Sequence, residues 1–485
     1  MQVALNSIIA ALLLTSLLPG EPELRPDACI SDQMYDRLPE LMAHYDIPGV
    51  GVGLVRDGQP VWSAGFGYAD REQTTPITTK TIFRAESMTK SLTAWAVMIL
   101  VEQGKINLSD PISDHLTRWK FPDSKFDAGQ ITIRHLLSHS AGIRFSVFTD
   151  IDLKDENLSP EYVLSNLAEK EDLLVQSPGE KFLYSNPGYV LLELLIEEVS
   201  GTSYPEFVQQ VLLSPLGMNH SGFTQPSETE RHSITGYLFD GQTVPLKPEP
   251  IHAHGGLYTT VDDFLKFAAA SAAGNQHHEI LSRESIQRMH TPEIETTGLY
   301  ALGSDSSGLG HFTESPGGGQ QLISHGGQGT GWLSYYFVLP ETGEGLVIFT
   351  NSEQSWRLIA DVLEMWTNGL ELSSPALSRS FSVIASILWV IIAVIVLAVL
   401  ALFGRIGFLW RKGQILFAPF KSTREIFWYI KLAGAFLPLI AAWWVSANYL
   451  VAGMFPVVSV WLTGALLLLT SGLLLKVCCF AKDTS

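Results

Sequence analysis

Three long apolar runs near the C-terminus constrain the architecture more than any other feature of the sequence. Residues 381–403 include 23 positions without a charged side chain, enough for a helix to cross a hydrocarbon layer of roughly 30 Å. Two more runs follow at about 432–449 and 457–475. Helices buried in a soluble domain are the alternative, but such helices usually keep some polar surface and these runs have almost none. We therefore predict an all-α membrane region over residues 381–485 with three transmembrane helices.

Charge is spread unevenly along the 485 residues. Residues 381–485 contain eight of the 31 lysines and arginines and two of the 49 acidic residues, so residues 1–380 have a net charge of −24 and the tail one of +6. A step of this size indicates two regions with different surroundings. The acidic part argues against nucleic acid as a partner, because phosphate contacts need clustered Lys and Arg.

The N-terminus and the loop charges indicate an orientation. Residues 1–20 have an apolar core that is short for a membrane span and typical of a signal peptide, although the usual basic start is missing. The loop at 404–425 contains five lysines and arginines, whereas the loop between the second and third runs contains none. By the positive-inside rule the first loop is cytoplasmic, which places residues before 381 outside the cell membrane and the C-terminus in the cytoplasm.

Cysteine usage adds little to this picture. Cys29 is the single cysteine before the membrane region, so no disulfide within the exported part is expected. Cys478 and Cys479 follow the last apolar run, where lipidation is one interpretation and apolar filling the simpler one.

The exported part, residues 30–370, is predicted to be a single α+β domain. Near its start, alternating apolar residues flank Asp57-Gly58, which predicts a hairpin. A second hairpin is predicted near its end, turning around residues 341–345, and helical periodicity occupies much of the sequence between the two. Strands at both ends with helices between them indicate one sheet built from both ends of the domain.

A serine and a lysine occur one helical turn apart in the stretch "FRAESMTKSLTAW". Positions i and i+3 share a helix face, so the amine of Lys90 can reach the hydroxyl of Ser87. An amine crowded by apolar neighbours loses its proton more easily and can then act as a base toward the serine. By itself this spacing is equally compatible with a surface lysine whose stem covers apolar surface.

Two downstream stretches can complete such a site. Tyr184 and Asn186 lie in a turn before an apolar helix, where a phenol can share a proton with the Ser–Lys pair and an amide can hold a substrate carbonyl. His325, Gly326 and Gly327 end a predicted strand; an exposed histidine there can donate to a substrate carboxylate, and glycines allow close approach of the backbone to a substrate. Each also has an ordinary interpretation, as turn residues or as a surface histidine.

With these stretches in this order, the chain resembles the serine beta-lactamase-like hydrolases. That family includes class C beta-lactamases, penicillin-binding peptidases, D-aminopeptidases and family VIII esterases, and its signature combines S-x-x-K, Y-x-N and a [K/H/W]-x-G strand. Further stretches match, among them "EQGKINLSDPISDHL", "ITIRHLLSHSAGI" and "HGGLYTTVDDFLKF". The resemblance covers about residues 32–365 and implies the beta-lactamase/transpeptidase-like fold, an antiparallel sheet flanked by helices plus a helical subdomain.

The resemblance also implies roles for individual residues. Ser87 would be the acylated nucleophile, Lys90 its base, and Tyr184 the group that relays a proton to the leaving group. Asn186 would position the substrate amide, and His325, Gly326 and Gly327 would line the strand side of the pocket. The backbone N–H groups of Ser87 and Gln328 would form an oxyanion hole.

One departure from the family pattern concerns the third motif. Many of these beta-lactamases have Lys-Thr-Gly or Lys-Ser-Gly where this chain has His-Gly-Gly. A histidine near its reference pKa of about 6.5 is mostly uncharged at neutral pH, so a weaker grip on a substrate carboxylate is expected. No cofactor or metal is implied: His252, His254 and the pair at 277–278 are scattered, and neither G-x-S-x-G nor H-E-x-x-H occurs.

The favoured function is a membrane-anchored, extracytoplasmic serine hydrolase acting on an amide or ester, plausibly a D-amino-acid or cell-wall-type peptide. Its partners would be a small-molecule or peptide substrate and membrane lipid. A non-catalytic or weakly catalytic penicillin-binding-type receptor that signals through the transmembrane helices is the alternative. A transporter is disfavoured, because the three runs contain no charged residue and only Lys431, just before the second run, could lean into the membrane interior.

Overall fold

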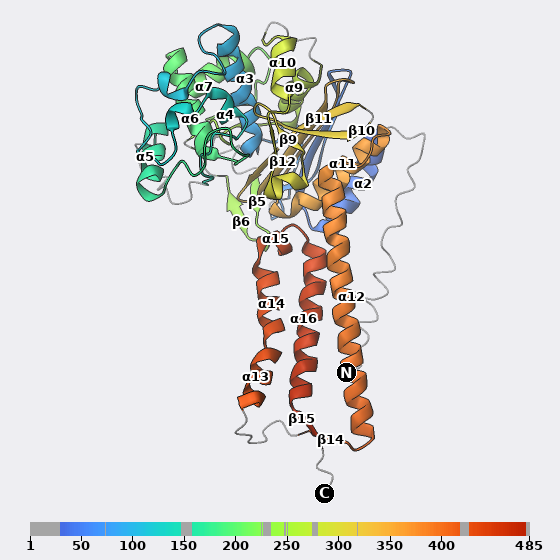
Figure 1. Ribbon diagram of the computed structural model, residues 1–485. Helices are drawn as coiled ribbons and strands as arrows, with labels where there is room; N and C mark the ends of the chain where they lie inside the picture. The colour runs from blue at the N-terminus through green and yellow to red at the C-terminus, as the bar shows by residue number, and fades with distance from the viewer. Residues whose placement is uncertain are drawn as a thin grey trace.

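A mixed α/β domain stands on one end of a bundle of long helices (Figure 1). The computed structural model describes residues 30–72, 74–146, 158–224, 226, 234–246, 249, 251–273, 280–317, 319–417 and 426–481. The predicted signal peptide over residues 1–20, Cys29 and the histidines at 277–278 lie outside these residues, as do parts of the loops at 143–160 and 220–255.

The domain is built on a nine-stranded antiparallel sheet with the order β3-β2-β1-β13-β12-β11-β10-β9-β8. Its first strands pair directly with its last, Val50 opposite Thr350 and Leu54 opposite Leu346, as predicted for a sheet made from both ends of the domain. The strands are β1 (Gly49–Arg56), β2 (Gln59–Asp70), β3 (Thr75–Pro76), β8 (Ile294–Glu295), β9 (Ser306–Ser307), β10 (Phe312–Gly317), β11 (Gln320–Gly329), β12 (Trp332–Leu339) and β13 (Glu344–Thr350).

Both predicted hairpins are present. Asp57 and Gly58 join β1 to β2 with positive φ angles of 50° and 67°, the backbone that a tight two-residue hairpin requires. The turn between β12 and β13 occupies residues 340–343. The turn chemistry therefore fixes the register of the central strands.

Successive side chains of the central strands point to opposite faces of the sheet, where they pack in two apolar cores. On one face Val50, Val52 and Ile348 pack with α2 (Ile30–Tyr45) and α11 (Trp356–Gly369). On the other face Val347 and Phe349 pack with the helical part. Fully buried aromatic rings lie in both cores, Trp366 in the first and Trp95 in the second.

The helical part lies between β4 (Phe83–Arg84) and the strands from β8 onward. Its central helix is α3 (Thr89–Glu102), which begins after a 3-10 turn at Glu86–Met88. Around it lie α4 (Ile133–Leu137), α5 (Pro160–Lys170), α6 (Asn186–Ser200), α7 (Tyr204–Val208) with a π-helical turn (Gln209–Leu213), α9 (Val261–Ala273) and α10 (Arg283–His290), and the short strands β5 (Thr235–Tyr237), β6 (Thr243–Pro245) and β7 (Tyr258–Thr259).

Within the part of the chain that the structure describes, three helical segments are long and apolar enough to cross a membrane: Ala376–Arg411, Tyr429–Ala447 and Pro456–Val477. The first, α12, is 36 residues long, about 54 Å at 1.5 Å per residue. It therefore extends beyond the charge-free run at 381–403 at both ends. We call the bundle of α12 to α16 the C-terminal bundle; its last helix, α16 (Pro456–Val477), contacts both α12 and α14.

The second segment differs from the continuous helix predicted at 432–449. It consists of α13 (Ile426–Ala435) and α14 (Leu437–Ala447), which are separated at Phe436. Pro438 lies in the first turn of α14, where its missing N–H would have no helical partner. A separate short helix, α15 (Tyr449–Ala452), connects α14 to α16. Phe436 keeps right-handed helical angles (φ −88°, ψ −12°), so α13 and α14 follow one another within the candidate span Tyr429–Ala447.

The start of α12 is attached to the domain by polar contacts. Glu314 of β10 accepts a hydrogen bond from the backbone N–H of Ala376 (2.6 Å) and lies 3.4 Å from Arg379. The hydroxyl of Ser378 donates to the carbonyl of Ala360 in α11 (2.7 Å). An acidic side chain at a helix N-terminus accepts a hydrogen bond from a backbone N–H that has no partner within the helix. It also interacts favourably with the positive end of the helix dipole.

We predict that the Glu314 contact makes stability pH-dependent. Burial raises the pKa of Glu314 to about 7, against the opposing effects of the Ala376 N–H and Arg379. The folded state then holds a proton that the unfolded state has lost, so the free energy of unfolding should fall as pH rises from about 5 to 8. Thermal unfolding of Glu314→Gln in detergent should show a weaker pH dependence than the parent protein. Glu72→Gln, at an exposed position, serves as the control, and an unchanged slope in Glu314→Gln would contradict the prediction.

Candidate active site

Ser87 lies in a tight turn that leads from β4 into α3. The preceding residue, Glu86, has a φ of 50°, a left-handed backbone that a non-glycine residue rarely adopts. The turn is held by hydrogen bonds from Ala85 N–H to Leu257 O (2.9 Å) and from Met88 N–H to Ala85 O (3.1 Å). Strain at Glu86 thus places Ser87 at the start of the helix, where it lines a cavity.

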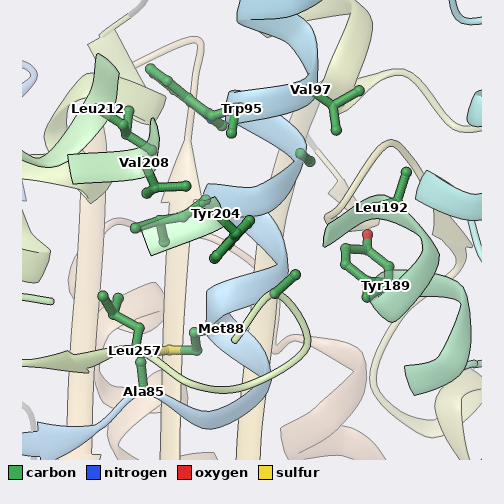
Figure 2. Close-up of a cluster of buried hydrophobic side chains, with 14 of the residues drawn as sticks. Ala85, Met88, Trp95, Val97, Tyr189, Leu192, Tyr204, Val208, Leu212 and Leu257 are labelled. Carbon is green, nitrogen blue, oxygen red and sulfur yellow. The ribbon is translucent and has the colours of Figure 1, made fainter. Parts of the chain in front are cut away.

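The helix that follows is enclosed by apolar side chains and cannot shift freely. Figure 2 shows Met88, Trp95 and Val97 of α3 among side chains from the surrounding segments, including Tyr189, Leu192, Tyr204 and Leu257. Every residue from Thr89 to Leu100 is buried. Close packing of this kind fixes the helix position, and with it the position of the turn that carries Ser87.

Lys90 is fully buried and its amine contacts three oxygen atoms. Nζ lies 3.1 Å from Ser87 Oγ, 2.8 Å from Asn186 Oδ1 and 2.6 Å from the carbonyl oxygen of His254. The lysine is therefore not a surface residue with its amine in water, which was the alternative interpretation of the S-x-x-K spacing.

Burial lowers the pKa of Lys90 well below its usual value, although the carboxylates of Glu86 and Glu249 act in the opposite direction. A neutral amine has two hydrogens and one lone pair. The oxygens of Asn186 and His254 can only accept, so in the neutral form of the amine they would take its two hydrogens and its lone pair would face the hydroxyl of Ser87. This is the geometry required of a base that removes the serine proton.

Tyr184 lies beside this pair, just before α6. The amine of Lys90 is 4.9 Å from the centre of its ring, and the ring stacks on Tyr300 at 4.8 Å. Burial raises the pKa of Tyr184 well above its usual value, while a hydrogen bond with Ser87 acts against this shift. The phenol therefore keeps its proton at neutral pH and can supply it to a neighbouring group.

Asn186 is the first residue of α6, after the cap made by Ser185, whose hydroxyl accepts from Gly188 N–H (3.0 Å). Its amide oxygen accepts from Lys90 and its Nδ2 donates to Ser146 O (2.8 Å). The residue thus orients the lysine, a partner that the sequence did not predict. An amide nitrogen has two hydrogens, so one remains for a substrate.

His325 differs from the exposed histidine that we expected. It is 2% exposed, and burial lowers its pKa to about 3. Nδ1 lies 2.8 Å from the carbonyl oxygen of Gly326 and must therefore carry the hydrogen, which leaves Nε2 as a buried lone pair with no partner in the structure. His325 is neutral and can accept, but not donate, a hydrogen bond at Nε2, so it is poorly suited to hold a carboxylate.

The glycines of β11 serve a packing purpose in addition to the expected access for substrate. A Cβ at Gly327 would lie 2.2 Å from Ala85 O, and one at Gly329 would lie 2.1 Å from a carboxylate oxygen of Glu86. The strand therefore approaches the turn that carries Ser87 as closely as backbone permits. Between the two glycines, the exposed side chain of Gln328 borders the cavity.

Three charged residues beside Ser87 were not identified from the sequence. Arg84 bridges Glu86 and Glu249, each at 2.8 Å, and all three line the cavity. Burial raises the pKa of Glu86, and the positive charge of Arg84 opposes that shift. Glu86 and Arg84 stand within the stretch that contains Ser87, but their partner Glu249 is distant in sequence and no local pattern points to it.

The predicted site residues meet at one cavity of about 840 Å³. Ser87, Tyr184, Asn186, His325, Gly326, Gly327 and Gln328 all line it, and Lys90 reaches it through Ser87. The volume falls within the range usual for small-molecule sites. In the described part of the chain no group of three metal-ligating side chains occurs. His252 instead lies 3.2 Å from the buried carboxylate of Glu193.

Comparisons with known proteins agree with this geometry. The family model described as Beta-lactamase matches residues 35–364. Protein flp of Staphylococcus aureus (strain NCTC 8325 / PS 47) is 27% identical over 391 residues, 79% of this chain and 76% of flp. The putative penicillin-binding protein PbpX of Bacillus subtilis (strain 168) is 31% identical over 257 residues, 52% of this chain and 60% of PbpX.

Solved structures give the same picture. The octameric penicillin-binding protein homologue from Pyrococcus abyssi superposes with a TM-score of 0.59 and 33% identity, over 66% of this chain and 73% of its own. The D-amino acid amidase from Ochrobactrum anthropi SV3, complexed with L-phenylalanine, gives a TM-score of 0.56 and 26% identity, over 67% and 91% of the two chains.

We predict that Gly327→Ala disturbs the site through packing. Its Cβ would meet Ala85 O at 2.2 Å and Ser334 Oγ at 2.4 Å, so β11 or the Ser87 turn must move. Overpacking of this kind costs about 1–3 kcal/mol, and thermal unfolding should show it as a lower midpoint temperature. Gly222→Ala is the matched control, because a Cβ there has no neighbour within 4 Å. Equal stability of the two variants would show that the close approach is unimportant.

Proposed function

Because the chain belongs to the beta-lactamase family, we propose that it is a serine hydrolase that cleaves an amide or ester through an acyl-enzyme on Ser87. The observation that carries the proposal is the buried amine of Lys90, 3.1 Å from Ser87 Oγ with two other oxygens as hydrogen-bond acceptors. A buried lysine costs stability unless it is neutral or paired. Its placement against a serine at a cavity is explained by a catalytic role.

Acylation would begin with attack of Ser87 Oγ on the substrate carbonyl carbon as Lys90 Nζ takes the serine proton. The carbonyl oxygen becomes negative, and we propose that the backbone N–H groups of Ser87 and Gln328 stabilise it; losing one such donor typically costs about 10²–10³ in rate. The helix start at Ser87 adds favourable dipole potential.

Collapse of this intermediate would break the bond to the leaving group. Tyr184 gives its proton to the departing nitrogen or oxygen. Lys90 then passes the proton that it took from Ser87 to Tyr184. The net result is the transfer of one proton from the serine to the leaving group. The hydrogen bond between Tyr184 and Ser87 supports this path. Water then attacks the acyl carbon as Lys90 takes its proton; the bond from this carbon to Ser87 Oγ breaks, Lys90 returns the proton to Oγ, and the carboxylic acid is released.

Substrate recognition would use Asn186 and the β11 edge. The free N–H of Asn186 can donate to a substrate carbonyl, and the neutral ring of His325 lines the same cavity. His325 is neutral and Asn186 is uncharged, so neither supplies a cation for a substrate carboxylate, which favours an amide or ester that is not held by its carboxylate. The amidase and penicillin-binding relatives make D-amino-acid and cell-wall-type peptides suitable candidates.

We further propose that the domain lies outside the cytoplasmic membrane. Support comes from the three apolar helices and the basic loop after α12, which by the positive-inside rule is cytoplasmic. The start of α12 is joined to the domain, so the domain would lie at the opposite, outer side. The predicted signal peptide accords with this orientation.

A receptor that binds a ligand without turnover is the second candidate. The physical connection of the domain to α12 through Glu314, Ser378 and Arg357 would support it. The neutral base beside Ser87 favours catalysis, because a binding pocket has no need of it.

The proposed function is tested by labelling and turnover of full-length protein in detergent or nanodiscs. A fluorophosphonate probe and labelled penicillin should show whether Ser87 is acylated, and nitrocefin, p-nitrophenyl esters and D-alanyl peptides should reveal turnover. Ser87→Ala should abolish every signal. Stable labelling without turnover would favour the receptor, and no Ser87-dependent signal with folded protein would refute the hydrolase.

We also predict the pH dependence of acylation. Because the pKa of Lys90 is lowered, the rate of labelling should rise with pH and level off well below the pKa of free lysine, about 10.4. Lys90→Arg keeps a permanent positive charge and should reduce the rate by at least about 10²-fold at every pH. His325 is neutral above about pH 3, so His325→Gln should leave the position of this rise unchanged. If the pH at which the labelling rate increases shifts in His325→Gln, the titrating group would be His325 and not Lys90.

A further inference from the structure

The cavity at Ser87 extends as far as the C-terminal bundle. Besides the site residues it is lined by side chains of α12 and of the α15–α16 connection: Leu377, Ser380, Phe381, Ile384, Met454 and Phe455. Figure 1 shows α12 beginning beside α11 of the domain, and α15 just below the domain near β6. We call this part of the cavity the lower arm.

Aromatic rings form a continuous wall at the lower arm. Tyr335 of β12 contacts Trp356 at 6.3 Å, Trp356 stacks on Phe381 at 6.2 Å, and Phe381 contacts Phe455 at 5.2 Å. Tyr335 and Trp356 also line the cavity, together with Leu299 and Leu302 of the 3-10 turn Gly298–Leu302. Rings that are held against one another in this way form a fixed surface, not a gap that side chains can close.

Charge is confined to the other end of the cavity. Arg84, Glu86 and Glu249 form their ion pairs beside Ser87, and Glu353 accepts from Gly331 N–H at 3.0 Å. None of the six residues of the lower arm is charged. Ser380 is the one hydroxyl among them, so a charged substrate portion placed there would lose its hydration with little compensation, whereas a hydrocarbon chain would not.

The lower arm also lies at the level where the apolar layer begins. Phe381 and Ile384 are in the first turn of the charge-free run at 381–403, and Phe455 immediately precedes α16 (Pro456–Val477). The apolar core of the domain is continuous here with that of the bundle: Leu358, Leu377, Phe381, Val458 and Leu462 belong to one cluster. A molecule that lies in the membrane would thus meet the lower arm with its hydrocarbon part.

We infer that the substrate is an amphiphile, an amide or ester whose polar scissile group lies at Ser87 while an attached hydrocarbon chain occupies the lower arm. This inference rests on the proposed hydrolase activity and specifies its substrate class. Each methylene that leaves water for such a site can raise kcat/KM by up to about fourfold, the equivalent of about 0.8 kcal/mol. Activity should therefore increase with chain length until the arm is full.

The test uses full-length protein in nanodiscs and two series of monomeric substrates. One series is p-nitrophenyl esters with acyl chains of increasing length, and the other is D-alanine esters with alkyl leaving groups of increasing length, so that a chain on either side of the scissile bond is covered. We expect kcat/KM to rise at least about tenfold from the shortest to the longest chain in one series. Ile384→Trp, which fills the lower arm, should remove that rise, measured within each variant as the ratio of kcat/KM for the longest and the shortest substrate.

Ile387→Trp is the matched control, because Ile387 is on the same helix, is 54% exposed and does not line the cavity. A length dependence that is equal in both tryptophan variants would reflect partition into the nanodisc and would overturn the inference. If kcat/KM does not change with chain length in either series but the shortest substrates are hydrolysed in a Ser87-dependent way, the inference of an amphiphilic substrate would be overturned. The proposed hydrolase activity would still stand. Absence of all Ser87-dependent hydrolysis would refute the proposed function, and the inference with it.

Gly303→Phe provides a second block if Ile384→Trp fails to fold. A Cβ at Gly303 would make ordinary contacts, 3.5 Å from Leu377 Cδ1 and 3.9 Å from Tyr335 Oη. The larger ring is then directed into the lower arm from the domain side. Loss of the length dependence in this variant supports the inference, and its retention contradicts it.

Discussion

The burial of one amine governs the organisation of this domain. Lys90 has no contact with solvent, and its nitrogen lies among three oxygens that come from the 3-10 turn Glu86–Met88, from α6 and from the segment before β7. A charged amine in that position would be strongly destabilising, whereas a neutral one fits the three partners. The surrounding features all maintain this arrangement: the left-handed Glu86, the capped start of α6 and the glycine-lined strand β11 that lies against the turn.

Much of this arrangement was predictable from sequence, because it depends on local geometry. Helical spacing placed Ser87 and Lys90 on one face, turn residues marked both hairpins, and the absence of charge over 381–403 marked the membrane helix. Family resemblance brought Tyr184, Asn186 and the β11 residues to the same place, and all of them line one cavity. Their proposed roles in catalysis are predictions that remain for experiment.

The features that sequence did not predict depend on contacts between distant segments. His325 becomes neutral and loses its donor at Nε2 because it is buried and because Gly326 O fixes its hydrogen on Nδ1. Glu86 and Arg84 form part of the site only through Glu249, which is far away along the chain. The sequence did not predict that α12 begins before the apolar run, because the charged Arg379 precedes that run. The partner of Arg379 is Glu314, which belongs to a distant strand of the sheet.

That unbroken first helix has a kinetic consequence. A catalytic domain on a flexible tether would sample a volume of solution, but α12 continues without interruption from its attachment at β10 through the apolar layer. In the proposed membrane arrangement, the cavity would thereby be held at one height and with one orientation relative to the lipid headgroups. Encounters with a reactant in the same leaflet would be limited by lateral diffusion, and turnover would follow the number of molecules per unit area of membrane.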